Sequence, residues 1–232
     1  MNEPRPRIAV LVFPGSNDDR DALWALGAFD ADAVPVWHAD PDLPAGVAGV
    51  VLPGGFSYGD YLRSGAIARF SPAMRAVRAF ADDGGLVLGI CNGFQILCEA
   101  GLLPGVLRPN TGLTFVCGDV PVRVERSDTP FTRRCAVGDE LLIPVKHGEG
   151  CFTYPTDRLQ ELEGQIVLRY GRSDNPNGST DDIAGIVNAA GNVMGLMPHP
   201  EHAVDPLLGS GDGALVLASL VESASERALA VA

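Results

Sequence analysis

A cysteine set between two glycines, at positions 89–93, is the part of this sequence best suited to chemistry. Cys91 follows a short apolar run, and a helical pattern begins directly after it. A strand, a tight turn and a helix, with small residues two places either side of a nucleophile, form a nucleophile elbow, here with sulfur in place of oxygen. Gly89 and Gly93 suit such a turn because residues without a Cβ relieve crowding beside the reactive side chain.

The helix expected after Cys91 would point unpaired N–H groups and the positive end of its dipole at the sulfur, which favours the thiolate. The same N–H groups could receive a developing oxyanion. A lone cysteine in an apolar run is, however, commonly an inert packing residue. The glycines and the cysteine alone leave both interpretations open, and partners elsewhere in the chain must decide between them.

Two other stretches offer such partners. Gly54 and Gly55 follow an apolar run, and their backbone N–H groups could supply an oxyanion donor, although paired glycines commonly form only a turn. His199 and Glu201 stand two apart, with a proline on each side of the histidine. A thiol nucleophile needs a base, and that imidazole needs an acceptor to fix its tautomer. A histidine in a proline-rich turn can equally be a plain surface residue.

The predicted elements explain how these residues would meet. Strands buried on both faces are predicted at residues 8–13, 49–52 and 86–90. Helical patterns lie between them, the first of which Ser16 or Asn17 could cap, and Pro35 makes the strand at 33–37 a candidate sheet edge. This alternation predicts an α/β fold with a parallel sheet, whose ligands gather at the carboxyl ends of the strands.

The pattern changes after Gly101 to shorter, alternating segments. Residues 183–188 and 192–197 predict a hairpin, and residues 214–228 predict a final helix. Neither a repeat nor a long linker interrupts the chain, so we expect one domain over residues 1–232.

Composition excludes several classes of function. A net charge of −12 argues against nucleic acid or an anionic membrane as the main partner. The apolar runs are strand-sized and the N-terminus lacks a signal region, so we expect a cytosolic protein. Five cysteines without a Cys-x-x-Cys pair fit a reducing compartment. We expect no metal, because the prolines flanking His199 and the lack of a His-Glu-x-x-His helix argue against a pair with His202.

These motifs also carry a family resemblance. Residues 52–55, 89–95 and 198–201 resemble, in order and spacing, the three defining motifs of the class I glutamine amidotransferases. Longer strings resemble the family of small amidotransferase subunits of phosphoribosylformylglycinamidine synthase, in purine biosynthesis; they lie at residues 54–69, 147–150, 175–179 and 197–201. The similarity covers essentially the whole chain.

The resemblance implies a flavodoxin-like three-layer sandwich with a mostly parallel central sheet. It also implies hydrolysis of L-glutamine to glutamate and ammonia. Cys91 would be the nucleophile, His199 the general acid and base, and Glu201 its orienting partner. Backbone N–H groups of Gly55 and Asn92 would hold the oxyanion, and the glutamine site would further include Gly54, Gln95, His147, Gly148 and Glu149.

Use of the ammonia points to a partner. Replacing an amide oxygen by nitrogen normally consumes ATP, but the chain has no Gly-x-x-x-x-Gly-Lys-Ser/Thr loop, so we expect no cofactor on it. The resemblance implies a large synthetase subunit, which uses ATP and Mg²⁺ to aminate formylglycinamide ribonucleotide, and a small third subunit. One departure is Asp18, which stands where relatives often carry cysteine and argues against a thiol role there.

Two other interpretations stay open. A stand-alone hydrolase of the same fold, such as a cysteine peptidase or a DJ-like stress protein, could share the elbow but lacks the distal Pro-His-Pro-Glu. A non-catalytic regulatory subunit could keep the fold, although a scaffold would not need a thiol, an imidazole and a carboxylate together.

Overall fold

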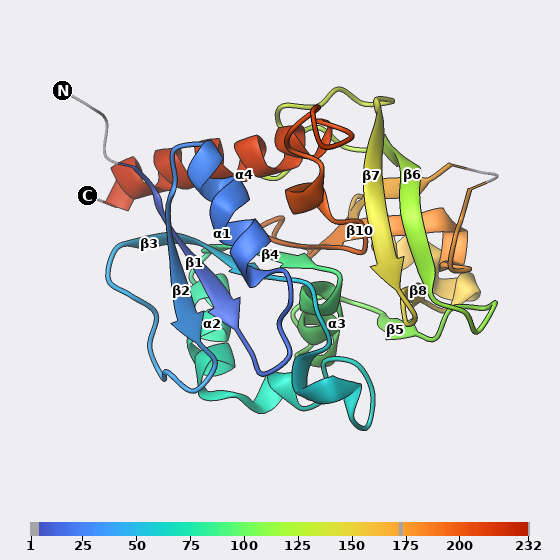
Figure 1. Ribbon diagram of the computed structural model, residues 1–232, viewed down its shortest axis with the longest axis horizontal. Coiled ribbons are helices and arrows are strands. Elements are labelled where there is room, and N and C mark those ends of the chain that lie inside the picture. The colour runs from blue at the N-terminus through green and yellow to red at the C-terminus, as the bar shows by residue number, and fades with distance from the viewer. Residues whose placement is uncertain (1–4, 172–173, 232) are drawn as a thin grey trace.

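The computed structural model describes residues 5–171 and 174–231 and is shown in Figure 1. Among these residues, nine strands form one sheet in the order β2-β1-β3-β4-β11-β10-β9-β6-β7, and β5 pairs separately with β8. The strands are β1 (Arg7–Val12), β2 (Asp32–Trp37), β3 (Val47–Leu52), β4 (Leu86–Ile90), β5 (Val106–Arg108), β6 (Val116–Val124), β7 (Glu140–His147), β8 (Cys151–Thr153), β9 (Ile166–Tyr170), β10 (Ile183–Val187) and β11 (Val193–Leu196).

The α-helices cover the sheet. They are α1 (Asp19–Ala28), α2 (Pro72–Asp82), α3 (Asn92–Glu99) and α4 (Gly213–Val231). Helices α1 and α4 contact each other and pack on β1 and β3, whereas α2 and α3 pack against β4 from the other face (Figure 1). Within the described ranges, none of the helices combines the length and the apolar character needed to cross a lipid bilayer.

One half of the sheet is parallel. Strand β1 pairs with β2 and β3, β3 pairs with β4, and β4 pairs with β11, all in parallel. The middle strands are buried along almost their whole length, as an apolar run covered on both faces should be. Strand β2, which contains Pro35, lies at the edge. The predicted α/β fold and the predicted edge strand are therefore confirmed.

The other half of the sheet is antiparallel. The predicted hairpin is present, since Gly185 of β10 lies opposite Leu196 of β11. Strands β9, β6 and β7 extend the sheet beyond it. The backbone N–H of His199 donates to the carbonyl of Pro144 at 2.8 Å, which ties the end of β11 to β7. The antiparallel extension thereby places β7 beside the carboxyl ends of the parallel strands.

The start of α1 differs from the prediction. Asp18, not Ser16 or Asn17, occupies the N-cap position, and its side chain makes no capping hydrogen bond. Ser16 Oγ instead accepts from the backbone N–H of Phe13 at 3.0 Å. The Asp18 carboxylate has another partner, the ammonium of Lys146 on β7, so it is not free to cap the helix.

Candidate active site

Cys91 stands at the sharp turn between β4 and α3. Its backbone has φ 50° and ψ −104°, a strained conformation for a residue with a side chain. The turn also presses on β3: a Cβ on Gly93 would collide with the carbonyl oxygen of Leu52. Only glycine fits at position 93, so the glycines of the motif allow the elbow to form against the neighbouring strand.

Cys91 differs from two other buried thiols, Cys98 and Cys135, in lining a cavity. Burial raises the pKa of Cys98 well above its ordinary value, and burial with the nearby charge of Asp139 raises the pKa of Cys135 to about 11. Such thiols stay protonated and are poor nucleophiles. The Cys91 sulfur, by contrast, lies 4.0 Å from the backbone carbonyl oxygen of Lys146, on the wall of a cavity.

His199 and Glu201 meet directly after β11. His199 Nδ1 lies 2.6 Å from Glu201 Oε1, and both side chains are fully buried. We assign the proton to Nδ1, because a carboxylate only accepts hydrogen bonds. The other ring nitrogen, Nε2, is buried without a hydrogen-bond partner in the described structure and is therefore free to act on the thiol and the substrate.

The charge state of His199 follows from its neighbours. Burial alone would lower its pKa, but the charges of Glu201 and Cys91 and the hydrogen bond to Glu201 outweigh burial and raise the pKa well above the ordinary value for histidine. The site therefore favours a positively charged His199 ring between Glu201 and Cys91. That is the charge arrangement an activated cysteine requires.

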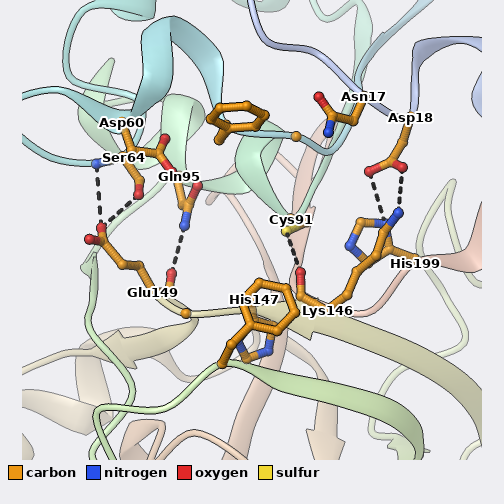
Figure 2. A pocket seen from close by; sticks show the side chains of 14 residues that line it. Asn17, Asp18, Asp60, Ser64, Cys91, Gln95, Lys146, His147, Glu149 and His199 are labelled. Carbon is orange, nitrogen blue, oxygen red and sulfur yellow. Dashed lines mark hydrogen bonds and ion pairs between the residues drawn. The ribbon is translucent and has the colours of Figure 1, made fainter.

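A cavity of about 400 Å³ opens beside Cys91 (Figure 2). His199 lines it on one side, and Ser64 and Glu149 line it on the other (Figure 2). Of the residues predicted for the site, those on the cavity wall are Gly55, Cys91, Gln95, His147, Gly148, Glu149 and His199. Gly54, Asn92 and Glu201 lie behind this wall.

The two expected oxyanion donors are placed differently. Gly55 lies on the cavity wall with φ +140°, a conformation that favours glycine. Asn92 is the first residue of α3, so its backbone N–H has no intrahelical partner. The Asn92 side chain links two neighbouring segments: its Oδ1 accepts from the backbone N–H of Ser57 at 3.1 Å, and its Nδ2 donates to Gln95 Oε1 at 2.8 Å.

Gln95 and Glu149 are joined on the side of the cavity away from His199. Gln95 Nε2 donates to the backbone carbonyl of Glu149 at 2.6 Å, and the Ser64 hydroxyl donates to the Glu149 carboxylate at 2.6 Å. Asp60 lies beside them. Burial and the charge of Glu149 raise the pKa of Asp60 to about 6, against a smaller opposing effect of Ser64.

His147 is a neutral histidine. Its Nδ1 lies 3.2 Å from Asn110 Oδ1, and its Nε2 lies 3.4 Å from Asn177 Nδ2. Burial and the charge of His199 lower its pKa to about 4. Because one ring nitrogen donates and the other accepts, His147 is fixed in one neutral tautomer and forms part of the cavity wall.

The structure also brings in residues that sequence reasoning missed: Asp18, Asp60, Ser64 and Lys146. Asp60 and Ser64 lie within the 54–69 string that carries the family resemblance, but that string assigns them no role. The other signals are that Asp18 lies in the loop after a buried strand, at the same sheet edge as the elbow, and that Lys146 adjoins His147. Four residues place possible metal-ligand atoms within 4.8 Å of one another: Asp18, His199, Glu201 and His202. The ammonium of Lys146 already pairs with Asp18 at 2.5 Å, so we assign no metal to this cluster.

Comparison with known proteins agrees with this site. The profile of the CobB/CobQ-like glutamine amidotransferase domain matches residues 5–211. Fold, site and match together define a class I glutamine amidotransferase. The chain is 60% identical to phosphoribosylformylglycinamidine synthase subunit PurQ of Rubrobacter xylanophilus, over 94% of this chain and 99% of that protein. It is 55% identical to PurQ of Salinibacter ruber, over 94% and 97% of the two chains.

A solved structure agrees as well. A chain in the structure of PurLQS from Thermotoga maritima superposes with a TM-score of 0.87 at 43% identity, over 94% of this chain and 99% of that one. The chain thus belongs to the PurQ family of phosphoribosylformylglycinamidine synthase subunits. The resemblance recognised in the sequence is confirmed.

Proposed function

We propose that this chain hydrolyses L-glutamine to glutamate and ammonia through Cys91, His199 and Glu201, and delivers the ammonia to a synthetase subunit. The observation that carries the proposal is the His199 ring, which pairs through Nδ1 with Glu201 and leaves Nε2 free beside the cavity that Cys91 lines. Membership of the PurQ family supports the substrate and the reaction.

In the first half of the reaction, the Cys91 thiolate attacks the carbon of the glutamine side-chain amide. The carbonyl oxygen becomes an oxyanion, which backbone N–H groups of Gly55 and Asn92 stabilise; each such donor contributes about 3 kcal/mol to lowering the barrier. His199 then gives its Nε2 proton to the amide nitrogen, and ammonia leaves. A γ-glutamyl thioester on Cys91 results.

In the second half, the neutral His199 ring accepts a proton from water, and the hydroxide formed attacks the thioester carbon. The carbon–sulfur bond breaks, glutamate leaves, and the thiolate and the imidazolium are restored. Glu201 stabilises the ring each time it becomes charged and keeps the proton on Nδ1. His147 does not compete as a base, because its Nε2 accepts from Asn177.

The cavity recognises glutamine through its far wall. Gln95 and Glu149 line the side away from His199, where the α-amino and α-carboxylate groups of glutamine would lie (Figure 2), and Gly148 also lines the cavity. Gly54 contributes indirectly, since a Cβ there would lie 2.6 Å from His199 Cε1. We assign it to packing under the histidine.

Ammonia is used on another chain. The Thermotoga maritima structure is of PurLQS, which supports assembly of this chain with a large synthetase subunit and a small third subunit. We propose that ATP and Mg²⁺ act on the synthetase, which converts formylglycinamide ribonucleotide to formylglycinamidine ribonucleotide. We further propose that residues 1–232 form one amidotransferase domain, and that it works in the reducing cytoplasm, which its free cysteines support.

Glutamate release tests the proposal. The wild-type chain, with the synthetase, nucleotide and formylglycinamide ribonucleotide, should release glutamate from L-glutamine, and Cys91→Ala should abolish release while ammonia-dependent synthesis persists. Cys117→Ala is the matched control, because this cysteine is exposed on β6 and should be dispensable. Glutamine-dependent synthesis that survives Cys91→Ala would leave the scaffold interpretation standing.

A further inference from the structure

Asp18 is a buried carboxylate beside the triad that the reaction above does not use. Its side chain is only 4% exposed. A carboxylate at an N-cap usually accepts a hydrogen bond from the first helical turn, but Asp18 makes no such bond. A buried charge that turns away from its local backbone partner must be compensated elsewhere.

The two oxygens of Asp18 face different groups. Oδ2 lies 3.6 Å from His199 Nδ1, the same nitrogen that lies 2.6 Å from Glu201. Oδ1 lies 2.5 Å from Lys146 Nζ and 3.5 Å from His202 Nε2. Figure 2 shows Asp18 directed at both Lys146 and His199. At 3.6 Å the contact with His199 is too long for a hydrogen bond, so Asp18 acts on the ring through its charge.

We propose that Asp18 is a second carboxylate partner of His199, a positioning residue that joins Glu201 in holding the ring as an imidazolium. The ion pair with Lys146 fixes the position of the Asp18 carboxylate. This inference rests on the triad roles proposed above. Gly54 leaves room for the arrangement, because a Cβ there would collide with Asp18 Oδ2. A negative charge within about 4–6 Å favours the charged form of an imidazole.

Lys146 allows the proposal to be tested by the direction in which the pKa of His199 changes. Its ammonium offsets part of the Asp18 charge, so losing Lys146 should favour the imidazolium, whereas losing the Asp18 charge should disfavour it. The charged and titratable groups around His199 are Cys91 at the elbow, Asp18 before α1, Lys146 and His147 on β7, and Glu201 and His202 on its own segment.

The test is an NMR titration of the four histidine rings in the full chain. In Asp18→Asn, the midpoint of His199 should move down by about one pH unit. In Lys146→Met, it should move up. The alkaline limb of kcat/KM for glutamine, measured on the complex with the synthetase, should move in the same directions. A midpoint that stays in place in both variants, or moves the same way in both, would overturn the proposal.

Asp21→Asn is the matched control. Asp21 Oδ2 also lies 3.5 Å from His202 Nε2, but the side chain is 53% exposed and does not reach His199, so the His199 midpoint should stay in place. Thermal unfolding checks that each variant is folded. If Asp18→Asn does not fold, the direction in which the His199 midpoint moves in Lys146→Met still tests the proposal. Absence of Cys91-dependent glutamate release in the wild type would refute the proposed function, whereas an active wild type with an unmoved His199 midpoint would refute only the role of Asp18.

Discussion

Glu201 and His199 are two residues apart in the chain, and their side chains meet at 2.6 Å with neither exposed to solvent. The intervening Pro200 restricts the backbone, and the His199 N–H is anchored on β7 through Pro144. A carboxylate that is paired so tightly in a buried site both fixes the proton on Nδ1 and stabilises the positive ring.

Glu201→Gln should lower glutamine hydrolysis by roughly a thousandfold or more, by analogy with triads that lose the orienting carboxylate. The amide keeps the shape but neither carries the charge nor forces the proton onto Nδ1. The loss should fall mainly on kcat, since Glu201 lies behind the cavity wall. Steady-state kinetics with the synthetase complex would measure it, and a rise in KM with an unchanged kcat would speak against this role.

Gly93→Ala should destabilise the fold by about 3 kcal/mol, because the new Cβ in the first turn of α3 would collide with the Leu52 carbonyl at the end of β3. Gly118→Ala on β6 is the control, since a Cβ there meets nothing within 4 Å. Urea unfolding measures both variants. Equal midpoints for the two would contradict the close packing of elbow and strand.

His147 should make the protein sensitive to acid. Its folded pKa, about 4, lies below the ordinary histidine pKa of 6.5, so between these values the unfolded chain binds more protons and stability falls as the pH falls. Asp60 opposes this, since its pKa is raised to about 6, which makes the unfolded chain bind fewer protons between about 4 and 6.

Mutation can separate the contributions of His147 and Asp60 to the pH dependence of stability. In His147→Gln, the loss of unfolding free energy between pH 7 and pH 5, measured by urea unfolding, should be about 1–2 kcal/mol smaller than in the wild type. The control is Asp60→Asn, in which the unfolding free energy should fall more steeply as the pH is lowered. If His147→Gln leaves the pH dependence unchanged, His147 is not the neutral histidine that its hydrogen bonds indicate.

Local patterns in the sequence lead to the proposed triad and predict much of the fold. The glycines around Cys91 permit a sharp turn, and Pro-His-Pro-Glu separates His199 from Glu201 by only two positions. The buried parallel strands follow from their continuous apolar runs, and Pro35 correctly indicates an edge. These features depend on residues that are close in sequence.

The missed features depend on contacts between distant segments. Asp18 and Lys146 are 128 residues apart, and only the antiparallel extension that carries β7 brings them together. The expected cap of α1 differs for the same reason, because Lys146 holds the Asp18 carboxylate. Ser64 and Asp60 lie in a segment without a periodic pattern, so the hydrogen bond of Ser64 to Glu149 and the effect of the Glu149 charge on Asp60 become visible only in three dimensions.

Trapping the covalent intermediate tests the central claim most directly. The assembled complex would be mixed with L-glutamine, quenched in acid within its turnover time, digested and examined by mass spectrometry, in the wild type, Cys91→Ala and His199→Asn forms. A γ-glutamyl group should appear on the Cys91 peptide of the wild type and be absent from that peptide in Cys91→Ala. A γ-glutamyl group on another residue, or glutamate formation in Cys91→Ala at the wild-type rate, would contradict the account.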